Sequence, residues 1–313
     1  MIISASRRTD IPAFYTPWFL NRLVAGYVLV RNPMDKHQVS KVSLNRDVVD
    51  GFVFWTKNPA PMIETLGALR NYPYYFQFTL TPYDSDVERY LPPKEEVLVP
   101  VFQKLSEKIG ANRVIWRYDP IFINEKYTAE YHLDAFEKFC ALLSGYTKKC
   151  VINFIDMYHK TEQNMRPFAL TPISIRLKKT LLTSLSTIAK AHNIQPETCS
   201  HGVKLDIPNA CCVDGNLFEE MSGFRYKLEK DKYQRVGCNC KESIDIGGYN
   251  TCGNGCLYCY ANINPDQCRL FVEKHNQYGE FLTGKRRKED RIYEREMYSC
   301  KDGQTRIFPS YEF

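Results

Sequence analysis

Three cysteines in one short segment have the residue type and the spacing to hold a metal centre. The segment TCGNGCLYCYAN, residues 251–262, contains a C-x3-C-x2-C pattern formed by Cys252, Cys256 and Cys259. With twelve cysteines in 313 residues, this pattern would arise by chance roughly 0.02 times per chain. Thiolates are soft ligands that select zinc or an iron-sulfur cluster, and Gly253 and Gly255 give the backbone freedom to fold around either. Three cysteines leave one iron of a [4Fe-4S] cluster open for chemistry, whereas structural zinc requires a fourth close ligand.

Four further cysteines lie upstream of this motif and are candidates for a second metal site. They are Cys199, Cys212, Cys238 and Cys240. Four thiolates complete the coordination of an iron-sulfur cluster or of structural zinc, and the alternative is a reducible thiol pair beside buried cysteines. Cys211 directly precedes Cys212, and two adjacent side chains do not readily reach the same metal. One of these two cysteines is therefore expected to be a bystander.

The cysteine content and the start of the chain predict a cytoplasmic protein. The cytosol keeps thiols reduced, so cysteines there favour metal binding or catalysis over disulfides. The opening residues MIISASRRTD do not follow the order of a secretory signal, and no run of about eighteen apolar residues occurs, so we expect no membrane association. Basic residues exceed acidic residues by 42 to 36, a net charge of +6. This mild excess permits a nucleic-acid partner without requiring one.

The cysteine motif also carries an aromatic residue, Tyr258, directly before its last cysteine, and in this it resembles the signature of the radical S-adenosylmethionine (SAM) superfamily. The resemblance implies a catalytic [4Fe-4S] cluster on the three cysteines, whose open iron binds the amino and carboxylate groups of SAM. It further implies an electron donor such as flavodoxin or ferredoxin, and cleavage of SAM into methionine and a 5′-deoxyadenosyl radical. By the same resemblance, the backbone of Tyr258 lies against the adenine, and an iron-sulfur cluster is preferred over zinc at the second site.

The elements that position these residues follow an alternating pattern. Upstream of residue 200, short β-branched or aromatic runs alternate with longer helical patterns, which predicts βα units and a parallel sheet. The predicted strands are Ile2–Ser6, Tyr27–Val30, Gly51–Trp55, Tyr74–Leu80, Arg113–Trp116, Cys150–Ile155 and Asn193–Glu197. The clearest helices are predicted at Glu95–Ile109, Ala129–Leu143 and Ile173–His192. Seven such units approach the eight of a TIM-like (β/α) barrel, so we expect an α/β protein with a full or partial barrel.

The cysteine motif lies late in the chain, whereas the superfamily usually carries it after the first barrel strand. A predicted strand at Ser243–Ile246 precedes the motif and a predicted helix at Ile263–His275 follows it. We therefore expect a circularly permuted barrel in which Ile2–Ser6 lies next to the cluster unit, with Asp10 placed to bind the SAM ammonium group. The expected domains are barrel units over residues 1–198, a cysteine-rich iron-sulfur region that completes the barrel over 199–275, and a C-terminal extension over 276–313.

Basic residues that directly follow predicted strands are candidates for binding an anionic part of a cofactor or substrate. In parallel α/β proteins, the loops beyond the carboxyl ends of the strands carry the active site. Arg8, Lys57 and Arg117 occupy such positions, in the segments SRRTD, TKNP and RYDP. Their type is not explained by turn formation, as it is for Asn or Pro, so we expect them to line the site.

The chain as a whole resembles an uncharacterised family, the domain of unknown function numbered 1848. The resemblance runs from ISASRRTDIP through WTKNP and RYDP to SIDIGGYNTCGNGCLYCYAN. That family is known for a C-terminal cysteine cluster of radical SAM type and has no established substrate. The resemblance therefore implies a cofactor and not a reaction.

Together these patterns predict a radical SAM enzyme whose substrate the sequence does not identify. The alternative from another class is a zinc-containing nucleic-acid or protein binding module on a catalytically idle barrel, with the basic cluster at Lys285–Lys288 as its contact surface. A third interpretation is an oxidoreductase whose clusters only carry electrons. DNA or RNA suits the mild basicity and the aromatic run at Tyr72–Phe78, and a small metabolite or a peptide suits the basic loops equally well, so nucleic acid is one candidate substrate among several.

Overall fold

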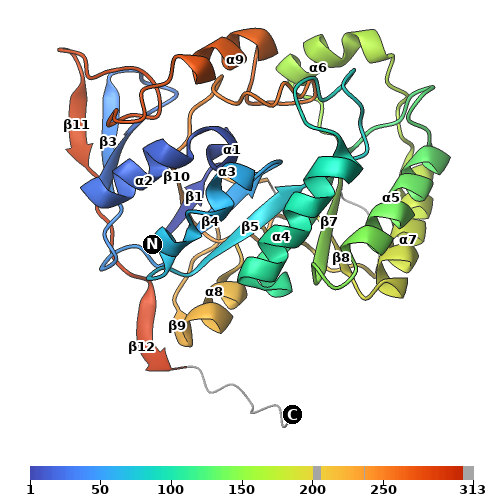
Figure 1. The fold of residues 1–313 in the computed structure, drawn as a ribbon, viewed down its shortest axis with the longest axis horizontal. Helices are drawn as coiled ribbons and strands as arrows, with labels where there is room; N and C mark the ends of the chain where they lie inside the picture. Colours follow the sequence, from blue (N-terminus) through green and yellow to red (C-terminus); the bar gives the residue numbers. More distant parts are fainter. Residues whose placement is uncertain (200–205, 236, 306–313) are drawn as a thin grey trace.

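The computed structural model describes residues 1–199, 206–235 and 237–305. Its centre is a seven-stranded sheet with the order β10-β1-β4-β5-β6-β7-β8 (Figure 1). The strands are β1 (Ile2–Ala5), β4 (Gly51–Thr56), β5 (Tyr74–Thr79), β6 (Val114–Ile121), β7 (Lys149–Phe154), β8 (Gln195–Thr198) and β10 (Ile244–Asp245). Every neighbouring pair in this sheet is parallel. The chain is therefore an α/β protein with a parallel sheet, as the alternation of strands and helices predicted.

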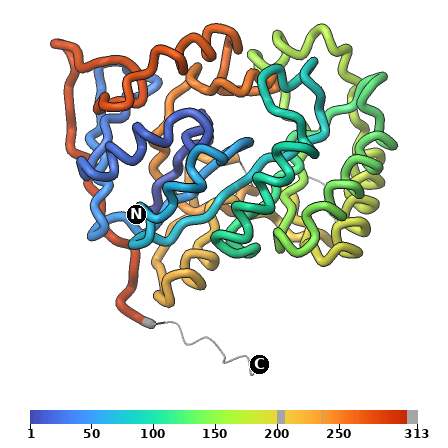
Figure 2. The backbone as a smooth tube through the Cα atoms, in the orientation of Figure 1, coloured from blue at the N-terminus to red at the C-terminus, as the bar shows by residue number. Residues whose placement is uncertain are grey.

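The two edges of the sheet are β8 and β10, so the described strands form an open sheet and not a closed barrel. β10 pairs with β1, with Ile3 opposite Ile244 and Ser4 opposite Asp245. A late strand of the chain thus lies beside its first strand, and Figure 2 shows orange and red segments next to blue ones at this end of the molecule. The predicted adjacency of the first strand and the unit that carries the cysteine motif is confirmed.

The helices follow the sheet strands in the order expected from the sequence. The described α-helices are α1 (Ile11–Phe14), α2 (Thr16–Ala25), α3 (Ala60–Ile63), α4 (Val99–Ile109), α5 (Ala129–Leu143), α6 (His159–Met165), α7 (Ile175–Ala191), α8 (Gly215–Ser222) and α9 (Pro265–Glu273). Shorter helical turns are η1 (Leu66–Leu69), η2 (Lys94–Leu98), η3 (Ala111–Arg113) and η4 (Arg166–Phe168). Thr128 and Ser174 cap α5 and α7 by accepting hydrogen bonds from backbone N–H groups of the first turn.

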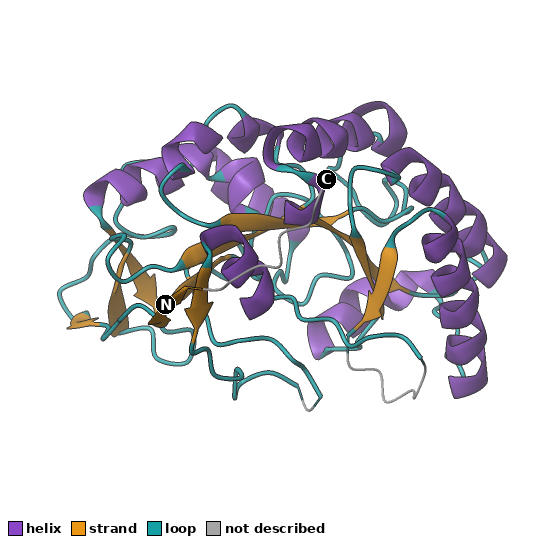
Figure 3. Ribbon diagram, turned by 90° about the horizontal axis from the view of Figure 1, so that it is seen from below, coloured by secondary structure: helices purple, strands orange, loops and turns teal. Residues whose placement is uncertain are grey.

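Alternate side chains of the strands pack in two layers on opposite faces of the sheet. Phe52, Phe54 and Phe76 belong to the main hydrophobic core, which the sheet shares with α4, α5 and α7. Val53 and Tyr75 point the other way and pack with α8 and several cysteines. Figure 3 shows a curved sheet with most helices along its outer side and loops across its inner side. We call this inner side the concave face.

Two smaller sheets accompany the main one. One contains β2 (Tyr27–Arg31), β3 (Gln38–Ser43) and β11 (Arg291–Glu294), and the other contains β9 (Phe224–Tyr226) and β12 (Lys301–Thr305). The prediction that Tyr27–Val30 belongs to the parallel sheet is wrong, because β2 pairs antiparallel with β3. Only residues 32–37 separate these two strands, and a parallel crossover needs about a dozen residues.

The late part of the chain completes both smaller sheets. β11 pairs with β3, and β12 pairs with β9. Residues beyond 275 are thus paired with segments from two earlier parts of the chain, and the proposed domain boundaries at 198/199 and 275/276 stay a prediction. None of the described helices is long and apolar enough to cross a membrane.

Candidate functional site

The loop of residues 247–262 connects β10 to α9 and gathers the three cysteines of the motif, which we call the first thiol cluster. Two hydrogen bonds close the loop: the Asn250 N–H donates to the Ala261 carbonyl over 3.0 Å, and the Asn262 side-chain amide donates to the Cys252 carbonyl over 2.9 Å. Burial and the nearby Asp10 carboxylate raise the pKa of Cys252, and the thiols of Cys259 and Cys256 raise it further. The structure therefore brings the three motif cysteines together.

Lysine side chains place positive charge beside the first thiol cluster. Burial raises the pKa of Cys256 to about 12, while Lys57 and Lys94 act in the opposite direction. Burial also raises the pKa of Cys259, which Lys57 and Lys160 lower. Positive charge stabilises the thiolate, the form of cysteine that binds metal. The lysines thus offset part of the effect of burial on the pKa of Cys256 and Cys259.

Gly255 is required by the path of the loop. Its φ is +70°, a left-handed conformation that side chains other than glycine rarely adopt. A Cβ atom at this position would also lie 2.5 Å from Cδ2 of Tyr90 and 3.2 Å from Cβ of Arg89. The sequence prediction that glycine allows the backbone to fold here is confirmed for this position.

Asp10 ties the loop after β1 to the cysteine loop and to β4. Its Oδ2 atom accepts hydrogen bonds from the backbone N–H of Lys57 at 2.7 Å and from Nδ2 of Asn254 at 2.9 Å. Its Oδ1 atom caps α1 by accepting from the Ala13 N–H at 3.0 Å. Burial raises the pKa of Asp10 in spite of these hydrogen bonds. The contact of Asp10 with a SAM ammonium group stays a prediction.

Glu88 is the buried carboxylate of the site and joins three loops. Its Oε1 atom lies 2.6 Å from Nζ of Lys57 and accepts a 2.8 Å hydrogen bond from the Thr81 hydroxyl. It also accepts a hydrogen bond from the Tyr258 hydroxyl, and Lys94 contacts its Oε2 atom. Burial raises the pKa of Glu88, but the two lysines outweigh it and lower the pKa to about 2. Glu88 is therefore ionised and holds both lysines and the aromatic residue of the motif.

The three basic residues that were predicted to line one site have different nearest partners, and their shared role stays a prediction. Lys57 lies at the first thiol cluster, with its Nζ atom 5.4 Å from the ring centre of Tyr258. The Arg8 guanidinium lies 5.0 Å from the ring centre of Tyr249, on the loop that leads into the motif. Arg117 lies on the concave face, where its Nη1 atom is 2.9 Å from Sγ of Cys212.

The four upstream cysteines also lie together, on the concave face, and we call them the second thiol cluster. They are Cys199, Cys212, Cys238 and Cys240, and all four are buried. Contacts with the thiols of Cys212 and Cys238 raise the pKa of Cys199, whereas contacts with Cys199 and Cys240 lower that of Cys238. The thiols thus form a connected chain in the order Cys212, Cys199, Cys238, Cys240.

All twelve cysteines of the chain are free thiols. In the ranges that the structure describes, no group of three or more His, Cys, Asp or Glu side chains is arranged so that it could hold a metal ion as it stands. The predicted metal ligands lie near one another within each thiol cluster. Their roles as ligands stay a prediction.

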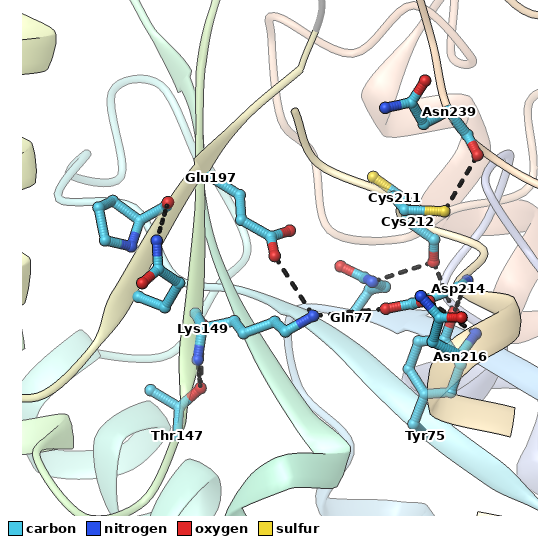
Figure 4. Close-up of polar contacts among 12 residues, drawn as sticks. Tyr75, Gln77, Thr147, Lys149, Glu197, Cys211, Cys212, Asp214, Asn216 and Asn239 are labelled. Atoms are coloured by element: carbon cyan, nitrogen blue, oxygen red, sulfur yellow. Dashed lines mark hydrogen bonds and ion pairs between the residues drawn. The ribbon is translucent and has the colours of Figure 1, made fainter. Parts of the chain in front are cut away.

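Figure 4 shows how the backbone around Cys212 is held. The Cys212 carbonyl accepts hydrogen bonds from the Tyr75 hydroxyl at 2.7 Å and from Nε2 of Gln77 at 3.0 Å. The thiol of the preceding Cys211 turns to a different side and donates to the carbonyl of Asn239 over 3.1 Å. Cys211 is outside the connected chain of thiols, although it is the nearest cysteine in sequence.

An ion-pair network around Lys149 lies next to the segment that contains Cys212. The Nζ atom of Lys149 lies 3.3 Å from Oε1 of Glu197 and 3.4 Å from Oδ2 of Asp214 (Figure 4). These residues come from β7, from β8 and from the N-cap of α8, respectively. The network therefore joins the strand that leads to Cys199 with the helix that follows Cys212.

Several residues of the site were not identified from the sequence. Glu88 belongs to no motif, and the only signal was that acidic residues closely follow a predicted strand, in the segment Tyr83-Asp84-Ser85-Asp86. Arg7 directly precedes Arg8 and faces the second thiol cluster, since the thiols of Cys240 and Cys212 raise its pKa against the effect of burial. Sequence alone gives no reason to choose between two adjacent arginines.

The fold and the site define an α/β protein that carries a thiol cluster at the edge of an open parallel sheet and another on its concave face. Residues 2–261 match the family model described as Domain of unknown function (DUF1848), and the chain belongs to this family. The resemblance to this family is thereby confirmed, whereas membership of the radical SAM superfamily stays a prediction.

Other comparisons add no functional assignment. No curated protein matches the chain. One similar solved structure is described as "Inhibition of the pneumococcal virulence factor StrH and molecular insights into N-glycan recognition and hydrolysis", with a TM-score of 0.26 and 12% identity. The match covers 66% of this chain and 56% of that chain, so the chain spans little more than half the length of that structure.

Proposed function

We propose that the protein is a radical SAM enzyme whose first thiol cluster holds a [4Fe-4S] cluster with one open iron. The observation that carries the proposal is the gathering of the three C-x3-C-x2-C cysteines in one partly buried loop, beside the positive charge of Lys57. Three thiolates are the ligand set that leaves one iron free for another donor. We further propose the cytoplasm as its location and a flavodoxin or ferredoxin as its electron donor.

The chemistry of the donor set fits an iron-sulfur cluster. Each thiolate of such a cluster binds a different iron, so the three sulfur atoms do not have to converge on one ion. The three residues are soft ligands on a loop that Gly255 allows to turn sharply. Such a cluster, when bound, supplies the electron that cleaves SAM into methionine and a 5′-deoxyadenosyl radical.

The residues around the loop have distinct positioning tasks in this proposal. Lys57 and Lys94 together contact one carboxylate, that of Glu88, so the three side chains carry one net positive charge next to Cys256. This charge favours an anionic ligand set and the carboxylate end of SAM. Asp10 accepts hydrogen bonds from Asn254 and from the N–H of Lys57, which holds the cysteine loop at the carboxyl ends of β1 and β4.

The order of strands supports the interpretation as a permuted and partial barrel. A strand, the cysteine loop and a helix follow one another as β10, residues 247–262 and α9, and β10 is the neighbour of β1. In this arrangement the cluster unit is the first unit of the sheet in space although it is late in the chain. The parallel strands β1 and β4 to β8 then follow in sequence order.

Anaerobic reconstitution with iron and sulfide tests the proposal. The loaded protein, reduced with dithionite in the presence of SAM, is expected to release 5′-deoxyadenosine, measured by liquid chromatography. Cys256→Ala should abolish this release. Cys268→Ser is the matched control, because Cys268 is a buried cysteine in α9 outside the motif. A fully loaded protein that leaves SAM intact contradicts the proposal, as does a Cys256→Ala variant with full activity.

A further inference from the structure

The second thiol cluster lies on the concave face among three arginines. The Nη1 atom of Arg117 is 2.9 Å from Sγ of Cys212, and an Nη2 atom of Arg235 is 3.9 Å from Sγ of Cys199. The guanidinium of Arg7 faces the thiols of Cys240 and Cys212. Guanidinium groups from β6, from the loop after β1 and from residue 235 thus converge on one group of cysteines.

Carboxylates account for only part of this convergence. Arg117 also contacts Asp119, and Arg235 contacts Asp156, so each has one carboxylate partner. The backbone N–H of Arg7 donates to Oδ2 of Asp245 at 2.9 Å, but in the described part of the chain its guanidinium has no carboxylate at hydrogen-bonding distance. Its nearest carboxylate oxygen, on Asp231, is 3.9 Å away, and its Nη2 atom is buried without a hydrogen-bond partner. One nitrogen of the Arg7 guanidinium therefore lacks an acceptor beside the thiols.

Neutral thiols compensate poorly for such charges. Placing guanidinium groups in a partly dry interior costs free energy unless an anionic group faces them, and a thiol is a weak acceptor. Four thiolates around a divalent metal ion, or around a [4Fe-4S] cluster in its oxidised form, leave two net negative charges. The arginines are then counter-ions that orient the thiolates and stabilise the metal centre through contacts with the ligand sulfur atoms.

Side chains of the sheet hold both the backbone at Cys212 and the arginines beside the thiols. The Cys212 carbonyl accepts two hydrogen bonds from side chains on β5 (Figure 4). The thiol of the same residue lies beside Arg117. The indole of Trp55 lies between two of the arginines, with its ring centre 5.1 Å from Cζ of Arg7 and 5.3 Å from Cζ of Arg117. Trp55 also donates from Nε1 to the Ser4 hydroxyl over 3.1 Å. The counter-ions are thereby kept in place by the sheet.

We propose that Cys199, Cys212, Cys238 and Cys240 form a second metal site, in which four thiolates bind zinc or an iron-sulfur cluster and Arg7, Arg117 and Arg235 balance their charge. This proposal does not depend on the chemistry at the first thiol cluster. Arg7 connects the two thiol clusters. Its guanidinium faces the second thiol cluster, and its carbonyl accepts a 2.7 Å hydrogen bond from the hydroxyl of Tyr260, the residue that follows Cys259.

The test removes the first cluster and asks whether metal remains. A chain with Cys252→Ala, Cys256→Ala and Cys259→Ala is purified without oxygen, loaded either with zinc or with iron and sulfide, and desalted. Elemental analysis is expected to find about one zinc or about four iron atoms per chain, and the two loading experiments identify which metal is held. A chain that retains neither metal overturns the proposal, whatever the outcome of the SAM cleavage assay.

A matched pair of cysteine variants locates the site. In the same background, Cys212→Ser is expected to lower the retained metal at least tenfold, whereas Cys211→Ser, one residue earlier, leaves it unchanged. Equal effects of both substitutions contradict the assignment. Circular dichroism checks the fold of each variant. If Cys212→Ser does not fold, alkylation of the unmutated chain replaces this variant. Removing the metal with a chelator should expose the four thiols of the second thiol cluster to the alkylating reagent and leave the labelling of Cys211 unchanged. The same labelling of all these thiols with and without chelator counts against the site.

The rate at which a chelator removes the metal tests the role of the arginines. Arg117→Gln is expected to release the bound metal to a chelator roughly tenfold faster, because it removes one counter-ion from the thiolates. Arg113→Gln is the control, since Arg113 precedes the same strand but donates to the Tyr74 carbonyl and stacks on the Tyr74 ring. The same release rate in both variants would show that the arginines have no electrostatic role at the site.

Discussion

The Nζ atom of Lys57 lies 2.6 Å from Oε1 of Glu88, and the Glu88 side chain is fully shielded from water. Burial acts to lower the pKa of Lys57, but Glu88 and the thiol of Cys256 outweigh it and the pKa is raised. The pair therefore stays charged inside the protein. Its members come from the loops after β4 and β5, so the ion pair joins two strand ends to the cysteine loop.

Replacing Lys57 with methionine should destabilise the protein strongly. Removing one partner of a buried ion pair costs about 3–5 kcal/mol when the other charge is left uncompensated. Glu88 keeps Lys94 at its Oε2 atom, so we expect a loss at the lower end of this range, about 3 kcal/mol. We expect Lys57→Met to lower the free energy of unfolding by about this amount in urea titrations, and also to reduce the iron bound at the first thiol cluster.

A matched variant separates burial from charge. Glu64, like Glu88, contacts two lysines, Lys104 and Lys108, but these side chains are 39–65% exposed. Lys104→Met should therefore cost less than about 1 kcal/mol, because exposed ion pairs contribute little. Similar losses in Lys57→Met and Lys104→Met would contradict the role assigned to the buried carboxylate.

Replacing Gly255 with alanine should disrupt the cysteine loop beyond the cost of its backbone conformation. Alanine in a left-handed conformation costs about 1–2 kcal/mol, and the new Cβ would lie 2.5 Å from the Tyr90 ring. A further loss of about 1–3 kcal/mol is expected from this overlap. Gly145→Ala is the control, because Gly145 has a φ of +84° and no atom within 4 Å of the added Cβ. Urea unfolding of both variants measures the difference, and equal losses would exclude a steric role for Tyr90.

The first thiol cluster could be predicted because its ligands are local in the chain. Three cysteines within eight residues form a pattern that chance rarely produces, and the strand before them could be matched to the strand at the N-terminus. Glu88 could not be predicted in the same way. Its partners Lys57 and Tyr258 lie 31 and 170 residues away, and no spacing in the sequence relates them.

The assignment of β2 failed for a different reason. A short β-branched run has the same appearance whether it joins a parallel sheet or an antiparallel one, and the deciding feature was the short connection to β3. The choice between Cys211 and Cys212 was likewise undetermined, because it depends on hydrogen bonds from Tyr75 and Gln77 on a distant strand. Local chemistry was therefore predictable, whereas contacts made across the sheet were not.

Removing the hydroxyl of Tyr75 should weaken the support of the second thiol cluster. This buried hydroxyl donates to the Cys212 carbonyl and accepts from the Asp214 N–H at 2.9 Å. Tyr75→Phe leaves both groups with fewer partners in a buried place, which should cost about 1–3 kcal/mol. Tyr74→Phe, on the opposite face of β5, should stay within about 0.5 kcal/mol of the unmutated protein. Thermal unfolding distinguishes the two, and a neutral Tyr75→Phe would show that these hydrogen bonds do not stabilise the region.

His132 should make the protein less stable in mild acid. Its ring is fully buried between the Tyr118 hydroxyl and the Phe122 carbonyl, at 2.9 Å from each, and burial lowers its pKa to about 4. The unfolded chain therefore binds a proton near pH 6.5 that the folded chain takes up only near pH 4, so this contribution to stability is complete above pH 6.5 and declines as the pH falls. Between pH 7 and pH 4.5 the loss should be about 2 kcal/mol.

Urea titrations of His132→Gln should show a correspondingly shallower decline over this range, although the variant is less stable at pH 7. The exposed His159→Gln variant should keep the full decline, and an unchanged decline in His132→Gln would mean that other groups cause it.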